Sequence, residues 1–467
     1  MGKKRSRAES GGRASTTSSS GRAKAQDTRI DYSGGRLDDE EVSGSEAEDE
    51  GAGGDESEGS DEETAEEKRR RLAKEYLRGM VGNGSSDDDG DASEDDDKHT
   101  QVSEKLRRER LEASGKYFRD LATSIKEQRE NNDDEFEEGL SRMTLGGHKL
   151  SVTSVVLSND EASIFSGSKD NSVIHWDTET GKKKQVLKAP WSRESHGDKQ
   201  CHEGEVLAVA VTTDGKYVVS GGRDKMLRVY DARQAHAEIK CFSGHRDAIT
   251  SLAFRRDSKS LFSGSLDRCL KHWDLNEMGY LETLFGHQEG VTAVDCWTKE
   301  RPVSCSVDRT VRLWKVAEES HLVFRGDKGA MDAVQLVTDD SYLTGAQDGS
   351  LALWKETQKK PVRSVQQAHG GDAGGARWIA SVATVKMSNL AASGSNDGYI
   401  RLWEVSAESR MLEQVAEIET EGFVNSLSMS PGLLVAGTGR EHKFGRWWST
   451  KGNKNKVIVM KLPSSDD

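Results

Sequence analysis

Histidine and aspartate recur in this sequence at a nearly fixed separation, in a region that is also rich in serine. Four pairs lie 21 or 22 residues apart: His148 and Asp170, His202 and Asp224, His245 and Asp267, and His287 and Asp308. One Ser-His-Asp set could activate a hydroxyl group for acyl transfer, but a catalytic triad is assembled once, beside one oxyanion hole. The repetition therefore favours a structural role. An enzyme is the least favoured class, because no singular nucleophile-base pair stands out and no metal-binding or cofactor-binding group is expected.

The repeated pairs belong to a longer unit, which is best developed in residues 244–274. In this unit a Gly-His pair at His245 is followed by the alternating run Ile249–Phe254, a turn at Asp267 and an apolar segment ending at Trp273. The alternation predicts a half-buried strand, and Gly, Asp and Ser turns separate it from two further strands. Seven such units, about 40–50 residues apart, predict a seven-bladed β-propeller, in which radial stacking covers the faces of each small sheet.

The period of these units resembles that of the WD-repeat family, and the resemblance implies a role for the repeated side chains. In that family the aspartate of the turn binds the histidine, which reaches a Ser or Thr and the tryptophan of the same blade. Weaker units contain Asp348 and later His369, and a divergent last unit ends at Trp447-Trp448. The expected structural network comprises His148, Asp170, Trp176, His202, Asp224, His245, Asp267, Trp273, His287, Asp308, Trp314, Asp348, Trp354, Asp397 and Trp403.

We therefore expect an all-β fold, a seven-bladed WD40 propeller over residues 139–467, preceded by a long acidic extension over residues 1–138. Residues 1–140 hold 24 Lys and Arg against 39 Asp and Glu, so this part of the chain accounts for the formal net charge of −14. Its Ser-, Gly- and acid-rich composition cannot offset the entropy cost of ordering, which predicts disorder. Either residues 140–145 or residues 457–462 can close the last blade, and we favour residues 140–145.

Several features of the sequence suggest a nuclear or cytosolic protein. The cluster Lys3-Lys4-Arg5-Ser6-Arg7 is readable as an import signal or as a solvated basic end. Serines with an acidic residue three positions on are candidate phosphorylation sites, which would add negative charge: Ser43, Ser45, Ser60, Ser85, Ser86 and Ser93. The five cysteines show neither paired nor metal-ligand spacing, which favours reduced thiols in the nucleus or cytosol. No apolar run approaches a membrane span or follows Met1 as a signal peptide would, so we expect no membrane association.

Two helical pieces are predicted within the extension, at about residues 64–80 and 104–130. The first starts with the capping-box spacing Thr64 to Glu67, and the second carries Leu111, Phe118, Leu121 and Ile125 on its apolar side. Either these helices pack on the propeller or they dock onto partner proteins or RNA. We favour partner docking, because neither helix has an obvious place in a closed ring.

One face of the ring is predicted to be basic over its first four blades. In the WD-repeat blades that these units resemble, the loop that holds the Gly-His pair and the turn that holds the aspartate open on the same face. Together they present Lys149, Lys169, Arg223, Lys225, Arg246, Arg268 and Arg309, which we call the basic arc. Such an arc on a nearly neutral domain is the footprint expected for a phosphate backbone. The alternatives are a chance distribution of surface charge and contact with the protein's own acidic extension.

The last unit carries the most specific resemblance. Gly439-Arg440-Glu441-His442-Lys443-Phe444-Gly445-Arg446-Trp447-Trp448 departs from the ordinary WD pattern and resembles the final blade of the WD-repeat subunit of the U3 small nucleolar ribonucleoprotein. Gly244-His245-Arg246-Asp247-Ala248 and Leu72-Ala73-Lys74-Glu75-Tyr76-Leu77 resemble the same family. Arg440, His442, Lys443 and Arg446 are therefore a candidate family-specific RNA contact. For Trp447 and Trp448 we favour core packing over base stacking.

The resemblance implies a non-catalytic nucleolar protein of the nucleus. Its implied partners are U3 small nucleolar RNA, bound at the box B/C element, the small kink-turn-binding protein with other box C/D subunits, and small-subunit processome proteins. Its implied role is early pre-rRNA processing toward 18S rRNA and small ribosomal subunit biogenesis. The main alternative is a protein-interaction scaffold, such as a ubiquitin-ligase substrate receptor.

Overall fold

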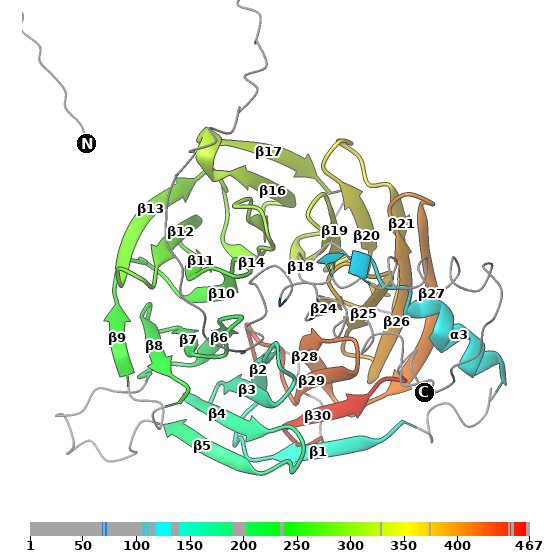
Figure 1. Cartoon of the computed structure of the whole chain (residues 1–467), viewed down its shortest axis with the longest axis horizontal. Coiled ribbons are helices and arrows are strands. Elements are labelled where there is room, and N and C mark those ends of the chain that lie inside the picture. The colour runs from blue at the N-terminus through cyan, green and yellow to red at the C-terminus, as the bar shows by residue number, and fades with distance from the viewer. Residues whose placement is uncertain are drawn as a thin grey trace, which may run out of the picture. The chain divides into compact units, whose positions relative to one another are not determined.

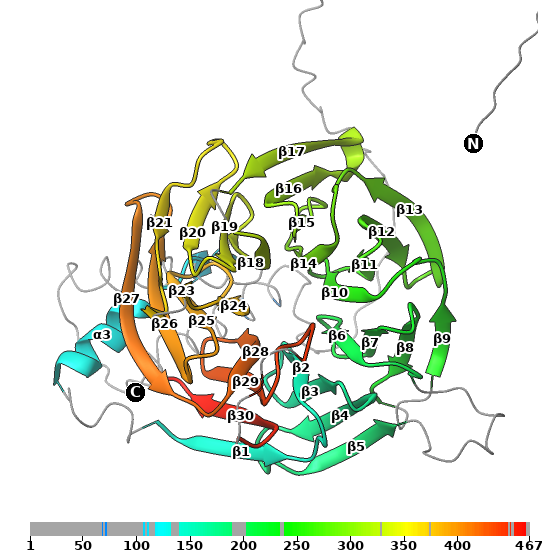
Figure 2. The same cartoon turned by 180° about the vertical axis from the view of Figure 1, so that it is seen from behind.

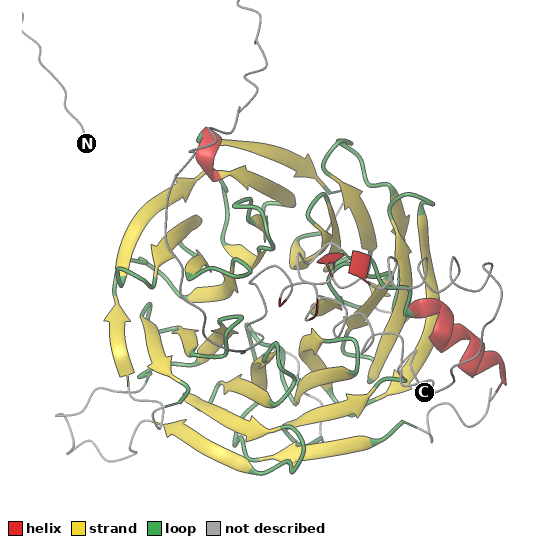
Figure 3. Cartoon of the chain, viewed as in Figure 1, coloured by secondary structure: helices red, strands yellow, loops and turns green. Residues whose placement is uncertain are grey.

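Seven four-stranded antiparallel sheets surround a central channel in the computed structural model of the chain (Figure 1; Figure 2 shows the other side). The structure describes residues 117–131, 140–188, 202–233, 238–326, 329–372, 375–446 and 453–463, and a few single positions outside these ranges. Strands dominate the described part, which also holds the helix α3 (Ala122–Asn131), the short 3-10 helix η1 (Val316–Glu318) and a few single helical positions before residue 112 (Figure 3). The seven-bladed WD40 propeller expected from the repeats is confirmed.

Each blade takes its strands in chain order, from the channel outward, except the last. Blade 1 contains β2 (Val152–Leu157), β3 (Ser163–Ser168), β4 (Ser172–Asp177) and β5 (Lys183–Lys188). Blade 2 contains β6 (Val206–Val211), β7 (Tyr217–Gly222), β8 (Leu227–Asp231) and β9 (Glu238–Phe242). Blade 3 contains β10 (Ile249–Phe254), β11 (Ser260–Ser265), β12 (Cys269–Asp274) and β13 (Gly279–Phe285).

The remaining blades follow the same plan. Blade 4 contains β14 (Val291–Asp295), β15 (Val303–Ser306), β16 (Thr310–Lys315) and β17 (Ser320–Arg325), with η1 (Val316–Glu318) before β17. Blade 5 contains β18 (Met331–Thr338), β19 (Ser341–Ala346), β20 (Leu351–Lys355) and β21 (Arg363–Val365). Blade 6 contains β24 (Ser381–Thr384), β25 (Leu390–Gly394), β26 (Tyr399–Ser406) and β27 (Met411–Glu419), after the small hairpin β22 (Gly371–Asp372) and β23 (Gly375–Ala376).

Blade 7 joins the two ends of the ring. It consists of β28 (Phe423–Met429), β29 (Leu433–Gly439), β30 (Lys456–Lys461) and, outermost, β1 (Arg142–Gly146). Leu145 of β1 pairs with Val457 of β30 in an antiparallel register. The expected N-terminal closure is confirmed, although the strand begins two residues later than residue 140. The third strand of the blade is β30, and the Trp447-Trp448 pair lies outside the described residues.

Bulges on the innermost strands tie neighbouring blades together. The ladder between β2 and β3 shifts register around Thr153, and equivalent shifts occur at Thr250 and Thr292. A bulge re-aims its side chain, and each threonine hydroxyl donates to a carbonyl of the next blade. The three donor-acceptor distances, to Val206, Val291 and Met331 in turn, are 2.6, 2.7 and 2.6 Å.

Glycine on the second strand allows this close stacking. A Cβ atom added at Gly264 of β11 would lie 2.7 Å from a side-chain carbon of Val294 and 2.8 Å from one of Val291, both in the next blade. Real Cβ contacts are not that short, so a larger residue would force the blades apart. The Ser-Gly-Ser segment of the repeat is thus a packing signal.

A strap that precedes the ring packs against its sixth blade. The strap is residues 117–131, which include α3 (Ala122–Asn131). Leu121, Ala122 and Ile125 are buried in the core cluster shared by blades 6 and 7. The amide oxygen of Asn389 accepts hydrogen bonds from the backbone N–H groups of Leu121 and Ala122, at 2.9 and 3.0 Å. The helix lies along β26 and β27 at the outer edge of the ring (Figure 1).

This packing corrects our expectation for the end of the second predicted helix. Its apolar side is not free to bind a partner protein, because Leu121 and Ile125 pack against blades 6 and 7 of the same chain. Phe118, which we placed on the same apolar side, is 48% exposed. The predicted helix at residues 64–80 lies almost entirely outside the described residues, as do the import signal and all six candidate phosphorylation serines. None of the described helices has the length and apolarity that crossing a membrane requires.

Candidate nucleic-acid interface

The repeated histidines are held by one pattern of hydrogen bonds. In blade 3, the distance from His245 Nδ1 to an Asp267 oxygen is 2.9 Å, and the distance from His245 Nε2 to the Ser263 hydroxyl is 2.7 Å. The indole N–H of Trp273 donates to the same hydroxyl at 2.8 Å. Close equivalents hold His202, His287 and His369.

Blades 1 and 5 depart from this pattern in different ways. In blade 1, His148 Nδ1 is 3.0 Å from the Ser172 hydroxyl and 3.5 Å from Asp170, so the serine stands closer than the carboxylate. In blade 5, Trp354 donates to the hydroxyl of Thr344 at 2.9 Å. The turn aspartate of that blade, Asp348, instead accepts from the hydroxyl of Ser350 at 2.6 Å.

The charge states follow from these contacts. Burial alone would raise the pKa of Asp267, but hydrogen bonds from His245 and backbone N–H groups outweigh burial and lower that pKa to about 2. Burial lowers the pKa of His287 despite the hydrogen bond to Asp308, so its ring is neutral. A carboxylate only accepts and an indole only donates, so the Nδ1–H donates to the aspartate and the serine hydroxyl donates to Nε2. Each histidine is therefore committed to its own blade.

These bonds bring the loops that carry the basic arc to one end of each blade. The backbone N–H groups of Lys149 and Arg246 donate to the turn aspartates of their own blades, Asp170 and Asp267, at 2.7 and 2.9 Å. The residue after each turn aspartate has a positive φ: 67° at Lys225, 71° at Arg268 and 63° at Arg309. Glycine occupies the same position in blades 5 and 6. Three cations of the arc thus stand where a glycine would cost less conformational energy.

Most of the predicted RNA-binding residues are exposed. Eight of the eleven lie on the surface: Lys149, Arg223, Lys225, Arg246, Arg268, Arg309, Arg440 and Arg446. The structure does not place the other three on an open rim. Lys169 and His442 are 3% exposed, and Lys443 is only partly exposed beside the central channel.

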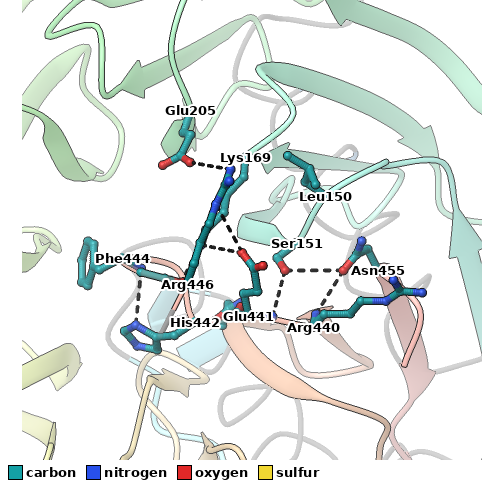
Figure 4. Close-up of polar contacts among 12 residues, drawn as sticks. Leu150, Ser151, Lys169, Glu205, Arg440, Glu441, His442, Phe444, Arg446 and Asn455 are labelled. Carbon is teal, nitrogen blue, oxygen red and sulfur yellow. Dashed lines mark hydrogen bonds and ion pairs between the residues drawn. The ribbon is translucent and has the colours of Figure 1, made fainter. Parts of the chain in front are cut away.

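The segment 440–446, which we call the clasp loop, explains two of these differences (Figure 4). The ammonium of Lys169 donates to the carbonyl of Gly445 at 2.9 Å and lies 3.5 Å from a Glu441 carboxylate oxygen. Burial lowers the pKa of Lys169, opposed by the carboxylates of Glu441 and Glu205. Lys169 therefore joins blade 1 to blade 7 and is not presented to solvent.

His442 faces inward for a different reason. Its ring packs edge-on against Trp378 and Phe444, with ring centroids 5.3 and 5.7 Å away. The backbone N–H of Phe444 donates to its Nδ1 atom at 3.3 Å. Burial, together with the charges of Lys443 and Lys169, lowers the pKa of His442 to about 3. A neutral buried imidazole cannot serve as the cationic contact that we expected.

Lys443 faces the channel, opposite a buried acid of blade 5. Burial lowers its pKa, opposed by the carboxylate of Asp332 and the thiol of Cys305. Asp332 is 1% exposed, and its two oxygens accept from the side-chain amide of Gln347, both at 3.1 Å. Burial raises the pKa of Asp332 to about 6, against the effects of Lys443 and Gln347. The channel has a volume of about 720 Å³, and this pair lines it.

The clasp loop leaves two arginines exposed near blades 1 and 2. Arg446 is 65% exposed, with nitrogens 3.6 Å from Glu205 and 3.7 Å from Glu441. Arg440 donates its backbone N–H to the side-chain oxygen of Asn455 at 3.1 Å. Asn455 in turn donates to the carbonyl of Lys149 at 3.1 Å, so the clasp loop and the first Gly-His loop form one surface.

Electrostatics differ along the arc. Arg223 pairs with Glu205 at 3.1 Å, whereas in the described part of the chain no carboxylate lies within ion-pair distance of Lys149, Lys225, Arg246, Arg268 or Arg309. Lys225 donates to the backbone carbonyl of Arg246 at 2.8 Å. Exposed acids intervene at Glu203, Asp247 and Glu289. The described residues contain no cluster of three or more His, Cys, Asp or Glu side chains placed to hold a metal ion.

Our sequence reasoning missed the residues that anchor the clasp loop. The Ser151 hydroxyl accepts the backbone N–H of Glu441 at 3.0 Å, and the Asn425 amide donates to the carbonyl of Glu441 at 2.9 Å. The carboxylate of Glu441 also holds Lys169. The only sequence signal was an acid inside an otherwise basic segment, Arg440-Glu441-His442-Lys443.

Known proteins match this chain in sequence and in fold. The family described as "WD domain, G-beta repeat" matches residues 139–177, 195–231, 237–274, 279–315 and 360–404. An Arabidopsis thaliana protein named "U3 snoRNP-associated protein-like EMB2271" is 35% identical over 446 residues, covering 91% of this chain and 91% of the relative. The Homo sapiens protein named "U3 small nucleolar RNA-interacting protein 2" is 37% identical over 408 residues, covering 86% of this chain and 83% of the relative.

A solved structure supports the same assignment. The structure titled "Crystal structure of RRP9 WD40 repeats" aligns with a TM-score of 0.65 and 40% sequence identity, covering 69% of this chain and 97% of that one. The repeats and the ring thus agree with relatives that are similar over most of their length. The chain belongs to the family of WD-repeat proteins associated with the U3 small nucleolar ribonucleoprotein.

Proposed function

We propose that this chain is a non-catalytic subunit of the U3 small nucleolar ribonucleoprotein, which binds U3 RNA and supports early processing of pre-rRNA toward the small ribosomal subunit. The observation that carries the proposal is the similarity over 86% of the chain to a human protein named for its interaction with U3 small nucleolar RNA. The names of the relatives give no support to the ubiquitin-ligase alternative. The repeated His-Asp sets support a scaffold, because each histidine is bound within its own blade.

The surface that fits RNA best is the part of the ring formed by blades 7, 1 and 2. Lys149, Arg440 and Arg446 are exposed there on loops that Asn455 joins, and the exposed Arg223 and Lys225 follow in the turn of blade 2. Cations on loops that are fixed by backbone hydrogen bonds suit phosphate groups at defined positions. Such contacts position the RNA and release counterions, so binding weakens as salt rises.

The blades that follow are a poorer match for a phosphate backbone. Arg246, Arg268 and Arg309 continue the arc onto blades 3 and 4, but they share that surface with exposed apolar side chains and with the acids Asp247 and Glu289. We therefore centre the RNA contact on the clasp loop and the first two blades.

The finer parts of the proposal follow from the family resemblance. The RNA element is box B/C of U3, bound beside the small kink-turn-binding protein and other box C/D subunits. The place of action is the nucleolus, within the small-subunit processome. In this arrangement the propeller is the rigid body and the clasp loop is the family-specific part of its RNA-facing surface.

A paired set of charge variants tests the RNA contact. Lys149→Ser with Lys225→Gly removes two exposed cations, and glycine suits the positive φ of position 225. The control is Lys182→Ser with Lys359→Ser, two exposed lysines in turns that join third and outer strands, at the far end of their blades. Both variants lose the same charge from the same full-length chain.

Binding of each variant to a U3 RNA transcript is measured over a range of salt concentrations. The Lys149/Lys225 variant should bind about 10-fold more weakly, and the slope of log K against log salt should fall by about 2, one for each phosphate contact. The control should match the wild-type slope. Equal slopes for all three proteins would refute this RNA surface.

A further inference from the structure

Two aliphatic side chains interrupt the polar end of the ring at neighbouring blades. The residue before the turn aspartate is Leu266 in blade 3, which is 37% exposed, and Val307 in blade 4, which is 42% exposed. The equivalent residues of the other blades that have this turn are polar: Lys169, Arg223, Gln347 and Asn396. An apolar side chain at this position is therefore a local property of blades 3 and 4.

Gly290 contacts both residues, Leu266 through its side chain and Val307 through its backbone, and we call Leu266 and Val307 the apolar shelf. A Cβ atom added at Gly290 would lie 2.8 Å from a methyl carbon of Leu266, so the leucine rests against the glycine backbone. The backbone N–H of Val307 donates to the carbonyl of Gly290 at 3.1 Å. The Leu266 side chain is thus packed at the boundary between the two blades, and the backbone of Val307 is anchored at the same boundary.

The same two blades carry exposed charged side chains in the turns and loops next to the apolar shelf. Arg268 and Arg309 follow the turn aspartates of the same blades, and neither has an ion-pair partner in the described part of the chain. Phe285, which is 71% exposed, lies outside these turns, at the end of the outermost strand, β13. Two exposed acids, Asp247 and Glu289, lie in the adjoining Gly-His loops.

We propose that the apolar shelf is a docking site for an acidic peptide segment of a partner protein, one that places an aliphatic or aromatic side chain between Leu266 and Val307. Two exposed aliphatic groups offer no stacking surface to a base, whereas they suit a peptide anchor. The neighbouring arginines then pair with acidic residues that flank the anchor, and charge complementarity favours this partner. Asp247 and Glu289 repel any anion, so the acidic residues of the peptide lie beside Arg268 and Arg309, whereas a phosphate backbone carries charge along its whole length.

This site is separate from the proposed RNA contact. The RNA surface lies over blades 7, 1 and 2, and the apolar shelf lies over blades 3 and 4. One ring can therefore hold RNA and a protein segment at the same time, as an assembly scaffold requires. Loss of RNA binding and loss of peptide binding can be told apart by mutation, because the two sites share no side chain.

Synthetic peptides test the proposal with the full-length chain. Each test peptide carries one Leu or Phe flanked by Asp and Glu, and its partner peptide has Ser in place of the apolar residue. Peptides that cover this chain's own residues 38–50 and 55–67, and an oligouridine of similar charge, complete the set. The protein variants are Leu266→Ala with Val307→Ala, and Arg268→Gly with Arg309→Gly at positions where φ is already positive.

A matched control removes two apolar side chains elsewhere. Leu322→Ala with Val323→Ala on β17 deletes groups of the same kind that are 37% and 40% exposed. We expect the acidic apolar peptides to bind wild type and this control alike. The Leu266/Val307 variant should bind them about 10-fold more weakly, as expected for a central anchor. The Arg268/Arg309 variant should also lose affinity, and its remaining binding should depend less on salt.

Three outcomes would overturn the proposal. The first is that no acidic apolar peptide binds better than its serine counterpart. The second is that the Leu266/Val307 variant loses oligouridine binding to the same extent as peptide binding, which would assign the shelf to RNA. The third is preferential binding of the peptides from residues 38–50 or 55–67, which would make this chain's own acidic extension the occupant.

Discussion

Removing the side chain of Asn389 should loosen the strap from the ring. Asn389 is 6% exposed, and its amide oxygen is the acceptor for the backbone N–H groups of Leu121 and Ala122. Its amide nitrogen donates to Asp120 at 2.5 Å. In Asn389→Ala both backbone donors lose their acceptor at the buried start of α3.

The magnitude follows from the number of groups left without a partner. An unsatisfied buried donor costs about 1–3 kcal/mol, so two donors with partial relaxation should lower the free energy of unfolding by about 2–4 kcal/mol. Ile125→Ala keeps these hydrogen bonds but removes a side chain that is 1% exposed, and should cost a similar amount, about 2–4 kcal/mol. Asn159→Ala changes an exposed asparagine and should stay within about 0.5 kcal/mol of wild type.

Two measurements separate global from local loss. Urea unfolding followed by tryptophan fluorescence gives the free energy of unfolding of the ring. Limited proteolysis reports whether the strap is cut before the ring unfolds, which is the expected result if residues 117–131 detach locally. Asn389→Ala that matches Asn159→Ala in both measurements would refute the strap as an integral part of the fold.

Three further predictions concern the blade network, the turns and the clasp loop. The folded pKa of Asp267 lies near 2, below its unfolded value, so the stability that its carboxylate contributes is complete above about pH 4 and is lost as the pH falls toward 2. Asp267→Asn should therefore lower the free energy of unfolding by about 2 kcal/mol at pH 7. It should also make that free energy depend less on pH between about pH 4 and 2. Lys225→Gly and Arg268→Gly should leave the thermal midpoint of unfolding unchanged or slightly raised. Glycine relieves the strain of a positive φ but increases the entropy of the unfolded chain, and the two effects oppose each other. A clear drop in the midpoint would show that these side chains stabilise the fold. Glu441→Ala leaves the buried ammonium of Lys169 without its carboxylate and should lower the free energy of chemical unfolding by about 2–4 kcal/mol. Lys169→Met removes the charge as well and should lower it by less. The reverse order would contradict a stabilising contact between Lys169 and the clasp loop.

The ring was predictable from sequence because its determinants repeat. Each His-Asp pair is set by local spacing, as at His245 and Asp267, and the alternation of Ile249–Phe254 identifies an inner strand without knowledge of its neighbours. The same signal recurs several times along the chain, so an error in one unit does not alter the fold. The N-terminal closure at β1 followed the same family pattern.

The strap and the clasp loop depend on single contacts between distant residues. Asn389 lies 268 positions from Leu121, and Lys169 lies 272 positions from Glu441. No periodic pattern in the sequence predicts either contact. The sequence shows that residues near Ile125 have an apolar side, but it does not show that blades 6 and 7 provide the matching core.

The candidate site was predictable in outline but not in every member. Exposure of Arg246 follows from its place in a Gly-His loop, and that of Arg268 and Arg309 from their places in the aspartate turns. Burial of His442 depends on Trp378, which a different blade supplies, and burial of Lys169 depends on the clasp loop. Residue type and local spacing contain neither piece of information.

The most direct test of the proposed function is ultraviolet crosslinking of the tagged full-length protein in cells, followed by sequencing of the bound RNA and mapping of the crosslinked peptides. We expect U3 RNA to be enriched and the crosslinks to fall on peptides that contain Lys149, Lys225 and residues 440–446. Absence of U3 RNA, or crosslinks confined to the opposite face around Lys182 and Lys359, would contradict the account.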